Sequence, residues 1–216
     1  MQRPPVRGHC PCARQYGDCA AANGRRGAAR AIARYCAPMA FHHIALATRD
    51  LDATHRFYTE VMGFELIKAV VAPTPNPKGG WAKHVFYDTG GDGLIAFWDL
   101  HDESMSDFDT AISTGLGLEV WVNHLAFAAS DLDDIEGRKQ NWLDAGFDVV
   151  EIDHGWCTSI YTNDPNGILV EWCTDTKPYT ADDRERALRL LASDEPELES
   201  PPMPSFHKAP KVDAPA

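Results

Sequence analysis

Residues 152–171 gather several side chains that could do chemistry around one tight turn. The segment carries His154 and Tyr161, then Asp-Pro-Asn-Gly at 164–167, and then Glu171. Asp-Pro-Asn-Gly is a strong turn signal, because proline presets φ and glycine tolerates a positive φ. The residues on both sides are β-rich, which predicts a hairpin with Glu171 on its second strand. A carboxylate in an otherwise apolar strand is costly to bury without a partner, and a metal ion is one such partner.

Two histidines with similar surroundings occur earlier in the chain. His43 begins the sequence H-I-A-L-A-T-R-D-L, and His124 begins H-L-A-F-A-A-S-D-L, 81 residues later. In both cases the histidine lies in an apolar strand, and the Asp-Leu pair predicts the start of a helix with aspartate as its N-cap. The similarity indicates a duplicated unit of strand, helix and further strands.

Each copy of this unit predicts one helix followed by three strands. The helices are expected over residues 51–62 and 132–145. Their expected buried side chains are Phe57, Tyr58, Val61, Ile135, Trp142 and Leu143. The expected strands are 64–72, 81–88 and 94–100 in the first copy, and 147–152, 157–162 and 168–174 in the second. The chain is therefore predicted to have an α+β fold made of two βαβββ modules, residues 39–100 and 120–176.

The pattern around the turn resembles the signature of the extradiol ring-cleavage dioxygenases. These belong to the vicinal oxygen chelate superfamily, together with glyoxalases, epimerases and bleomycin-resistance proteins. The matching features are the histidine before the tyrosine, the Tyr-x-x-Asp-Pro-x-Gly core and the final glutamate. The resemblance covers roughly residues 40–175. It implies that the two modules form one curved mixed sheet with a metal ion in its cup.

The resemblance also implies a set of metal ligands. The ligand positions of the superfamily match His43, His124 and Glu171, whereas the fourth position falls at Ala96 or Phe97, neither of which can bind a metal. Two histidines and one carboxylate suit non-haem Fe(II) and leave positions open for a small aromatic substrate and O₂. Manganese, zinc and nickel are alternative ions.

Three further residues are candidates for contact with the substrate. By resemblance, His154 and Tyr161 would hydrogen-bond to the substrate oxygens, and His84 is the best match to the acid–base histidine of the family. Each could instead be an ordinary packing residue of its strand. His42 neighbours His43 but is expected to point to the opposite face of the strand and to be structural.

These features predict an Fe(II)-dependent dioxygenase that opens a catechol-like aromatic ring. One alternative is a glyoxalase-type lyase, isomerase or epimerase, which would want a fourth ligand near Ala96. Asp99 could supply that ligand if a strand slip or bulge brought it into the site. The other alternative is a non-enzymatic binding protein like the bleomycin-resistance proteins. The match of His43, His124 and Glu171 to three ligand positions of the superfamily weighs against it.

Length and charge restrict the class of protein further. The 216 residues are consistent with one domain plus tails. The net charge is −12, of which residues 1–38 carry +6, so the remainder carries −18. An acidic body argues against nucleic acid as a partner, and no apolar run is long enough to cross a bilayer. We expect a cytoplasmic protein and leave open whether it forms a homo-oligomer.

The two ends of the chain differ from the modules. Residues 1–38 are rich in arginine, alanine and glycine, without apolar periodicity or the apolar core of a signal peptide. We expect a non-folded leader or an over-extended start. Residues 177–216 predict one helix capped by Thr180, followed by a Pro-rich tail that lies along the body or stays mobile. The helix has a narrow apolar stripe of Ala187, Leu188 and Leu191.

Two cysteines, Cys157 and Cys173, lie in the strands of the predicted hairpin. They are expected to be reduced thiols of a cytoplasmic protein rather than a disulfide.

Overall fold

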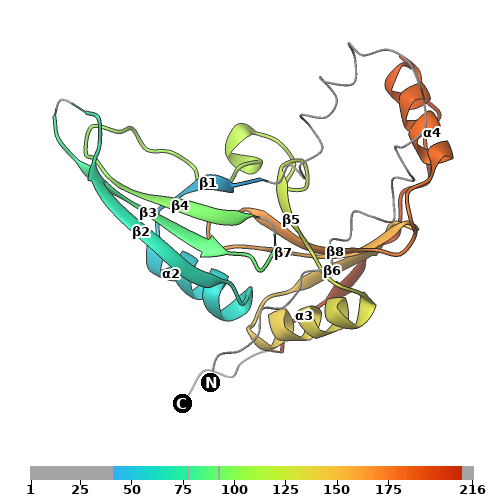
Figure 1. The fold of residues 1–216 in the computed structure, drawn as a ribbon, viewed down its shortest axis with the longest axis horizontal. Coiled ribbons are helices and arrows are strands. Elements are labelled where there is room, and N and C mark those ends of the chain that lie inside the picture. The colour runs from blue at the N-terminus through green and yellow to red at the C-terminus, as the bar shows by residue number, and fades with distance from the viewer. Residues whose placement is uncertain (1–40, 77, 92, 211–216) are drawn as a thin grey trace, which may run out of the picture. The chain divides into compact units, whose positions relative to one another are not determined.

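The computed structural model describes residues 41–76, 78–91 and 93–210. In them the chain forms two mixed β-sheets, one of four strands and one of five (Figure 1). The predicted leader, residues 1–38, lies outside the described residues, so its expected lack of structure stays a prediction.

The first module follows the predicted order of elements. Its elements are β1 (His43–Thr48), α2 (Leu51–Arg56), the π-helical turn η3 (Phe57–Val61), β2 (Glu65–Pro73), β3 (Trp81–Asp88) and β4 (Leu94–His101). The strand order is β1-β4-β3-β2, with β1 parallel to β4 and the other pairs antiparallel. Asp50 caps α2 by accepting a hydrogen bond from the amide of Ala53 at 2.8 Å, as the sequence predicts.

The second module repeats this arrangement. After the short 3₁₀ turn η4 (Thr114–Leu116), its elements are β5 (His124–Ala128), α3 (Leu132–Asp144), β6 (Val149–Asp153), β7 (Cys157–Asn163) and β8 (Leu169–Asp175). Here β5 is parallel to β8, and the order is β5-β8-β7-β6-β9. Asp131 caps α3 through the amide of Asp134.

The last strand of this sheet comes from the C-terminal segment. β9 (Ser205–His207) pairs antiparallel with β6, so part of the predicted tail does lie along the body. Before it, α4 (Ala181–Leu191) starts at Thr180 with a capping box, as predicted. None of the side chains of α4 is buried, so its apolar stripe covers no core. Within the described residues, no helix is both long and apolar enough to cross a bilayer.

The α+β class and the two βαβββ modules are confirmed, but the sheet is not continuous. The resemblance implied a single curved sheet, whereas hydrogen bonding between strands stops at β1 and β5, which belong to different sheets. The modules are joined by side-chain packing instead. Phe57 of the first module contacts Phe147 of the second at 5.1 Å between ring centroids, and Phe64 contacts Trp172 at 5.9 Å.

The core lies between the helices and one face of each sheet. Phe57, Tyr58, Ile135 and Trp142 are buried, as predicted, and Val61 and Leu143 pack against them while partly exposed. Alternation along β4 buries Ile95 and Phe97 on this helix-covered face. Each sheet therefore has a second face, turned away from its helix, that is available for a site.

The Asp-Pro-Asn-Gly turn at 164–167 belongs to the second module and is hydrogen-bonded to the first. The buried carboxylate of Asp164 accepts hydrogen bonds from the amides of Asn166 and Ile168, each at 2.8 Å, and from the hydroxyl of Tyr58 at 3.0 Å. The side-chain amide of Asn166 donates to the hydroxyl of Thr54 at 3.1 Å. Burial raises the pKa of Asp164, and these hydrogen bonds partly offset that shift. We call Tyr58, Thr54, Asp164 and Asn166 the inter-module clasp.

Gly167 closes the same turn at a φ of +74°, where a larger residue would be strained. A Cβ there would also approach Ala111 Cβ to 3.1 Å. Both constraints explain the glycine that ends the motif.

Candidate functional site

Four of the predicted site residues lie on, or directly beside, the face of the second sheet that is turned away from α3. Ala126 of β5 pairs with Glu171 of β8, and Glu171 pairs with Tyr161 of β7. His124 lies two residues before Ala126 and therefore shares this face. His154 follows β6 directly. Strand alternation and register thus bring together side chains that are up to 47 residues apart in sequence.

The four side chains form one hydrogen-bonded chain. His124 Nε2 lies 3.0 Å from Glu171 Oε2, and the Tyr161 hydroxyl donates to Glu171 Oε1 at 3.2 Å. His154 Nε2 lies 3.0 Å from the Tyr161 oxygen. Because the hydroxyl has only one proton and gives it to Glu171, its oxygen accepts from His154 Nε2–H. The carboxylate of Glu171 is buried, at 5% exposure of the residue.

The tautomer of His124 follows from its other contact. His124 Nδ1 lies 3.0 Å from the main-chain oxygen of Trp121. A carbonyl oxygen can only accept, so Nδ1 carries the proton, and in a neutral imidazole Nε2 then presents a lone pair. That lone pair faces a carboxylate oxygen at 3.0 Å, which is unfavourable unless a proton or a cation lies between the two atoms. The pair is therefore satisfied either as an imidazolium–carboxylate salt bridge or by a metal ion held between the two donor atoms.

Tyr161 is held in its protonated form. Burial, together with the neighbouring charge of Glu171, raises the pKa of Tyr161 well above its ordinary value. The hydroxyl therefore remains a hydrogen-bond donor at neutral pH. On the same sheet, burial raises the pKa of Cys157 to about 12, and Cys157 and Cys173 are both free thiols.

A pocket of about 410 Å³ opens beside these residues. Its lining consists of Val120, Trp121, His124, Val150, Ile152, His154, Tyr161 and Leu169. The described lining contains no lysine or arginine, so its polar side-chain groups are the two imidazoles, the phenol and the indole N–H of Trp121. Such a pocket suits a largely apolar molecule with a few polar atoms.

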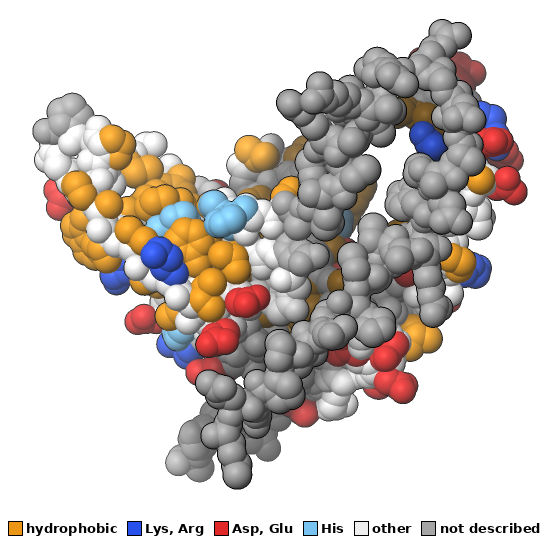
Figure 2. Space-filling view, in the orientation of Figure 1, with side chains coloured by type: hydrophobic (Ala, Val, Ile, Leu, Met, Phe, Trp, Pro, Cys, Tyr) orange, Lys and Arg blue, Asp and Glu red, His pale blue; other side chains and the backbone are white. Residues whose placement is uncertain are grey.

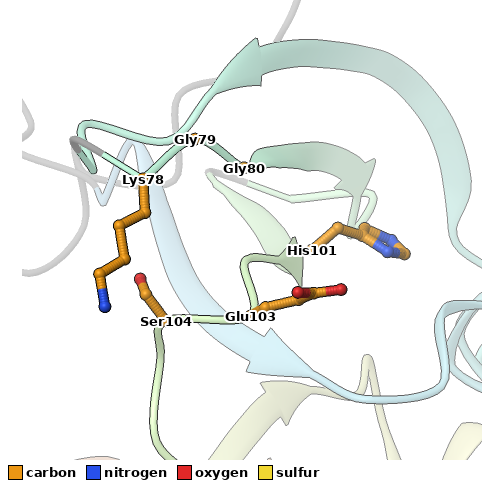
Figure 3. Close-up of a pocket in the computed structure, with 6 residues that line it drawn as sticks. All are labelled: Lys78, Gly79, Gly80, His101, Glu103 and Ser104. Carbon is orange, nitrogen blue, oxygen red and sulfur yellow. The ribbon is translucent and has the colours of Figure 1, made fainter.

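A somewhat larger hollow, of about 460 Å³, lies at the outer end of the first sheet (Figure 3). Lys78, Gly79, Gly80, His101, Glu103 and Ser104 line it. In Figure 3 the side chains of His101 and Glu103 extend away from those of Lys78 and Ser104. Because none of the predicted site residues lines this hollow, size alone does not identify the site.

The other predicted residues, His43 and His84, share a face of the first sheet. The ring centroids of His43 and His84 are 6.0 Å apart, and His84 stacks on Trp98 at 3.8 Å. His84 Nε2 is buried and has no hydrogen-bond partner in the described part of the chain. Burial, with a smaller contribution from His43, lowers the pKa of His84. Figure 2 shows histidine side chains among hydrophobic ones over this sheet.

The position equivalent to Glu171 in the first module is Ala96. Ala45 of β1 pairs with Ala96 of β4 just as Ala126 of β5 pairs with Glu171 of β8. Of the two positions that the sequence left open, Phe97 belongs to the buried core instead. The first module therefore offers no carboxylate at this position.

Asp99 does not replace the missing ligand. It lies three residues after Ala96, on the opposite face of β4, and the register between β3 and β4 is continuous. Its carboxylate contacts His101 Nε2 at 2.8 Å and Lys83 Nζ at 3.6 Å. The bulge that would bring Asp99 into the site is absent from this strand pair, so Asp99 faces away from the position of Ala96.

The structure therefore divides the predicted site between two sheets. His124, Glu171, Tyr161 and His154 are in contact with one another on the second sheet, while His43 and His84 lie on the first. Within the residues that the structure describes, no three histidine, cysteine, aspartate or glutamate side chains gather closely enough to hold a metal ion. The convergence of all three ligands stays a prediction.

Three contributors to the site were missed from the sequence: Trp121, Val150 and Ile152. The Trp121 carbonyl, which sets the tautomer of His124, is a main-chain atom and leaves no signal in the sequence. Val150 and Ile152 line the pocket because they alternate with Glu151 along β6, a period that could have revealed them.

Comparison with known proteins identifies one family. The model of the glyoxalase/bleomycin resistance protein/dioxygenase superfamily matches residues 40–172. That range covers both modules up to Trp172 in β8. No curated protein sequence matches the chain significantly.

Among solved structures, three that are similar to this chain match about two thirds of its length. Lactoylglutathione lyase from Agrobacterium tumefaciens is 25% identical, with a TM-score of 0.44 and coverage of 64% of this chain and 95% of that one. The fosfomycin resistance protein FosX from Listeria monocytogenes is 19% identical, with a TM-score of 0.42 and coverage of 66% and 94%. TnmS3, an antibiotic-binding protein from Streptomyces sp. CB03234, is 18% identical, with a TM-score of 0.42 and coverage of 65% and 98%.

Proposed function

Because the chain belongs to the glyoxalase/bleomycin resistance protein/dioxygenase superfamily, we propose that it is a metal-dependent, extradiol-type ring-cleaving dioxygenase. Its substrates are a catechol-like aromatic compound and O₂. In this proposal His43, His124 and Glu171 hold the metal ion, with Fe(II) as the physiological ion. Manganese, zinc and nickel are the alternatives to be tested.

The contact between His124 and Glu171 carries the proposal. The Trp121 carbonyl directs the proton of His124 to Nδ1, which leaves the Nε2 lone pair 3.0 Å from a buried carboxylate oxygen. Histidine ligands of metals usually donate their other ring N–H to a carbonyl or carboxylate in this way. A cation would remove the repulsion between the two donor atoms.

The alanine at position 96 favours the dioxygenase over the glyoxalase-type alternative. With no carboxylate there, the set is limited to two histidines and one glutamate. Such a set, when it holds Fe(II), leaves adjacent positions open for a diol and O₂. A four-ligand site would need a donor that the first module lacks at this position.

The composition of the pocket supports an aromatic substrate. Its walls are formed by apolar side chains such as Val150, Ile152 and Trp121. A phosphonate or a polycarboxylate would call for a cationic side chain, and the described lining has none. A neutral ring with two adjacent hydroxyl groups matches a mostly apolar pocket whose polar groups are uncharged hydrogen-bonding side chains and imidazoles.

Three residues would act on the substrate itself. The Tyr161 hydroxyl donates to Glu171 and His154 donates to Tyr161; on substrate binding each would exchange its present acceptor for a substrate oxygen and so orient the ring. His84 is the proposed acid–base residue: its Nε2 has no hydrogen-bond partner among the described residues, so this nitrogen is not committed to another group.

His43 must reach the other ligands across the gap between sheets. It is exposed on the first sheet, beside Phe41 and Ile44, which are also exposed. It can meet His124 by closure of the two sheets of one chain or by contact with a second copy. Mixing a His43→Ala chain with a Glu171→Gln chain distinguishes these routes, because activity returns only if two copies share a site.

The direct test is anaerobic purification with metal quantitation, followed by O₂ uptake on a panel of catechols. We expect bound iron and O₂ consumption with at least one catechol. Bound metal without O₂ uptake on any catechol would contradict the dioxygenase and favour the glyoxalase-type reaction.

A non-enzymatic binding protein is the second candidate, because the pocket is mostly apolar and contains an exposed tryptophan. Tight binding of an aromatic drug by a protein that takes up no metal would support this function instead.

A further inference from the structure

His42 turns its ring back onto His43. The two Nδ1 atoms are 2.8 Å apart, and the rings meet edge to face with centroids 5.0 Å apart. Strand alternation predicted that His42 would face the other way. However, β1 begins only at His43, so the side chain of His42 is not bound by that alternation. The carbonyl of His42 accepts a hydrogen bond from the amide of Leu94 at 3.1 Å, which fixes the backbone beside the first sheet.

At 2.8 Å, the two Nδ1 atoms can share only one proton. If His43 Nδ1 donates, His43 Nε2 keeps a lone pair and can bind a metal ion. If His42 donates, the proton of a neutral His43 lies on Nε2, which then cannot bind a metal ion. The direction of this one hydrogen bond therefore decides whether His43 presents a ligand atom at Nε2.

The second module shows how the equivalent histidine is controlled. There the Trp121 carbonyl can only accept, so it forces the proton of His124 onto Nδ1. His43 has no such carbonyl contact in the described part of the chain; its ring nitrogen meets His42 instead. Phe86 and His84 flank the ring of His43, at centroid distances of 5.5 and 6.0 Å, and limit its rotation.

We propose that His42 is a positioning residue that accepts the Nδ1 proton of His43 and so keeps His43 Nε2 free as a ligand atom. This inference rests on the proposed metal site, and it gives His42 the part that the Trp121 carbonyl has for His124. Partners that orient a ligating histidine typically change metal affinity about 10- to 100-fold when they are removed.

The test compares metal affinity in variants of the full chain. After removal of bound metal, Co²⁺ is titrated into the wild type, His42→Ala and His42→Gln, with the d–d absorption band as the signal. We expect His42→Ala to weaken Co²⁺ binding about 10- to 100-fold. His42→Gln should restore most of the affinity, because its side-chain oxygen can accept the same proton. His101→Gln, at the end of β4, is the matched control and should match the wild type.

A second measurement reads the tautomer without any metal. In ¹⁵N-labelled, metal-free protein, the ring nitrogen shifts of His43 should report a proton on Nδ1 in the wild type and in His42→Gln. In His42→Ala they should move toward the Nε2–H form. A wild-type His43 protonated on Nε2, or an unchanged tautomer and affinity in His42→Ala, would overturn the proposal.

If His42→Gln loses as much affinity as His42→Ala, a hydrogen-bond acceptor at position 42 does not restore His43, and the positioning role is wrong. Failure of the metal site as a whole is distinguished by Glu171→Gln. Wild-type affinity in that variant would refute the proposed function, whereas the tautomer of His43 is measured independently of any metal.

Discussion

Glu171 occupies the middle of the hydrogen-bonded chain on the second sheet. One of its oxygens meets His124 and the other accepts from Tyr161. The carboxylate is buried, and the salt-bridge partner it has among the described residues is His124. The two oxygens therefore have distinct surroundings. Oε2, beside His124, is the one suited to a metal ion, and Oε1 orients the side chain of Tyr161.

Replacing Glu171 with Gln tests the first of these roles. The amide keeps the size of the side chain but loses the charge that would bind the ion. We expect metal affinity to fall by at least about tenfold, which corresponds to roughly 1.4 kcal/mol. Metal quantitation and a thermal melt measure the outcome. Retained metal and activity would remove Glu171 from the ligand set.

Replacing Tyr161 with Phe tests the second role. The change removes only a hydroxyl, so the fold and the bound metal should remain. Turnover should fall by about tenfold or more, because a hydrogen bond that strengthens in the transition state is lost. His154→Ala should also spare metal content and lower turnover. Turnover per bound iron is the deciding measurement, and unchanged values in both variants would leave these residues as packing groups.

Strand β6 contributes to the pocket, and its position depends on contacts with β7, β9 and α3. Its residues Val150 and Ile152 line the pocket, and it is held between β7 and the short strand β9. Glu151, between them in sequence, faces away from the pocket. Its Oε2 atom meets His207 Nε2 of β9 at 2.9 Å and Lys139 Nζ of α3 at 3.0 Å.

Because of these contacts, we expect the pairing of β9 with β6 to weaken at acidic pH. Burial raises the pKa of Glu151, but hydrogen bonds and charge from Lys139 and His207 outweigh it, so the pKa is lowered from 4.5. The ionised Glu151 carboxylate therefore adds to the free energy of unfolding in full above about pH 4.5. This contribution is lost as the pH falls through the lower pKa that Glu151 has in the folded state.

Glu151→Gln should destabilise the protein at pH 7 by about 1–2 kcal/mol and reduce the loss of stability between pH 5 and pH 3. Chemical denaturation at several pH values measures both effects. The same acid dependence in the wild type and the variant would show that Glu151 does not hold β9.

The inter-module clasp determines how the two halves of the molecule hold together. Thr54 comes from α2 and Tyr58 from the π-helical turn η3, while Asp164 and Asn166 belong to the turn before β8. Much of the motif that resembles a catalytic signature therefore has a structural task, because the turn fastens the Glu171 hairpin to the other module.

Tyr58→Phe should destabilise the protein by about 1.5–3 kcal/mol, because a buried carboxylate loses a hydrogen-bond donor. Asp164→Asn should couple to it in a double-mutant cycle, since both changes remove the same contact. Tyr179→Phe is the matched control: this exposed tyrosine donates to Asp175 at 3.3 Å, and its loss should change stability by less than about 0.5 kcal/mol. Equal effects of Tyr58→Phe and Tyr179→Phe would contradict the clasp.

The sequence by itself determined the elements and the repeat. Strand β3 was predicted at its observed bounds, and the helix caps at Asp50, Asp131 and Thr180 are in place. These features depend on side-chain periodicity and on turn and cap chemistry, which act over a few residues. The π-helical turn η3 and the three-residue strand β9 leave signals too short for this reasoning.

The arrangement of the site depended on contacts between distant segments. Only the register shows that Ala96 matches Glu171 and that Asp99 faces the other way. Whether β1 and β5 pair is a matter of long-range packing, and they lie in separate sheets, so His43 is not joined to His124 by the fold of the described residues. The Trp121 carbonyl and the turned ring of His42 are likewise results of three-dimensional position, because neither a main-chain oxygen nor a side-chain rotation is written in the residue types.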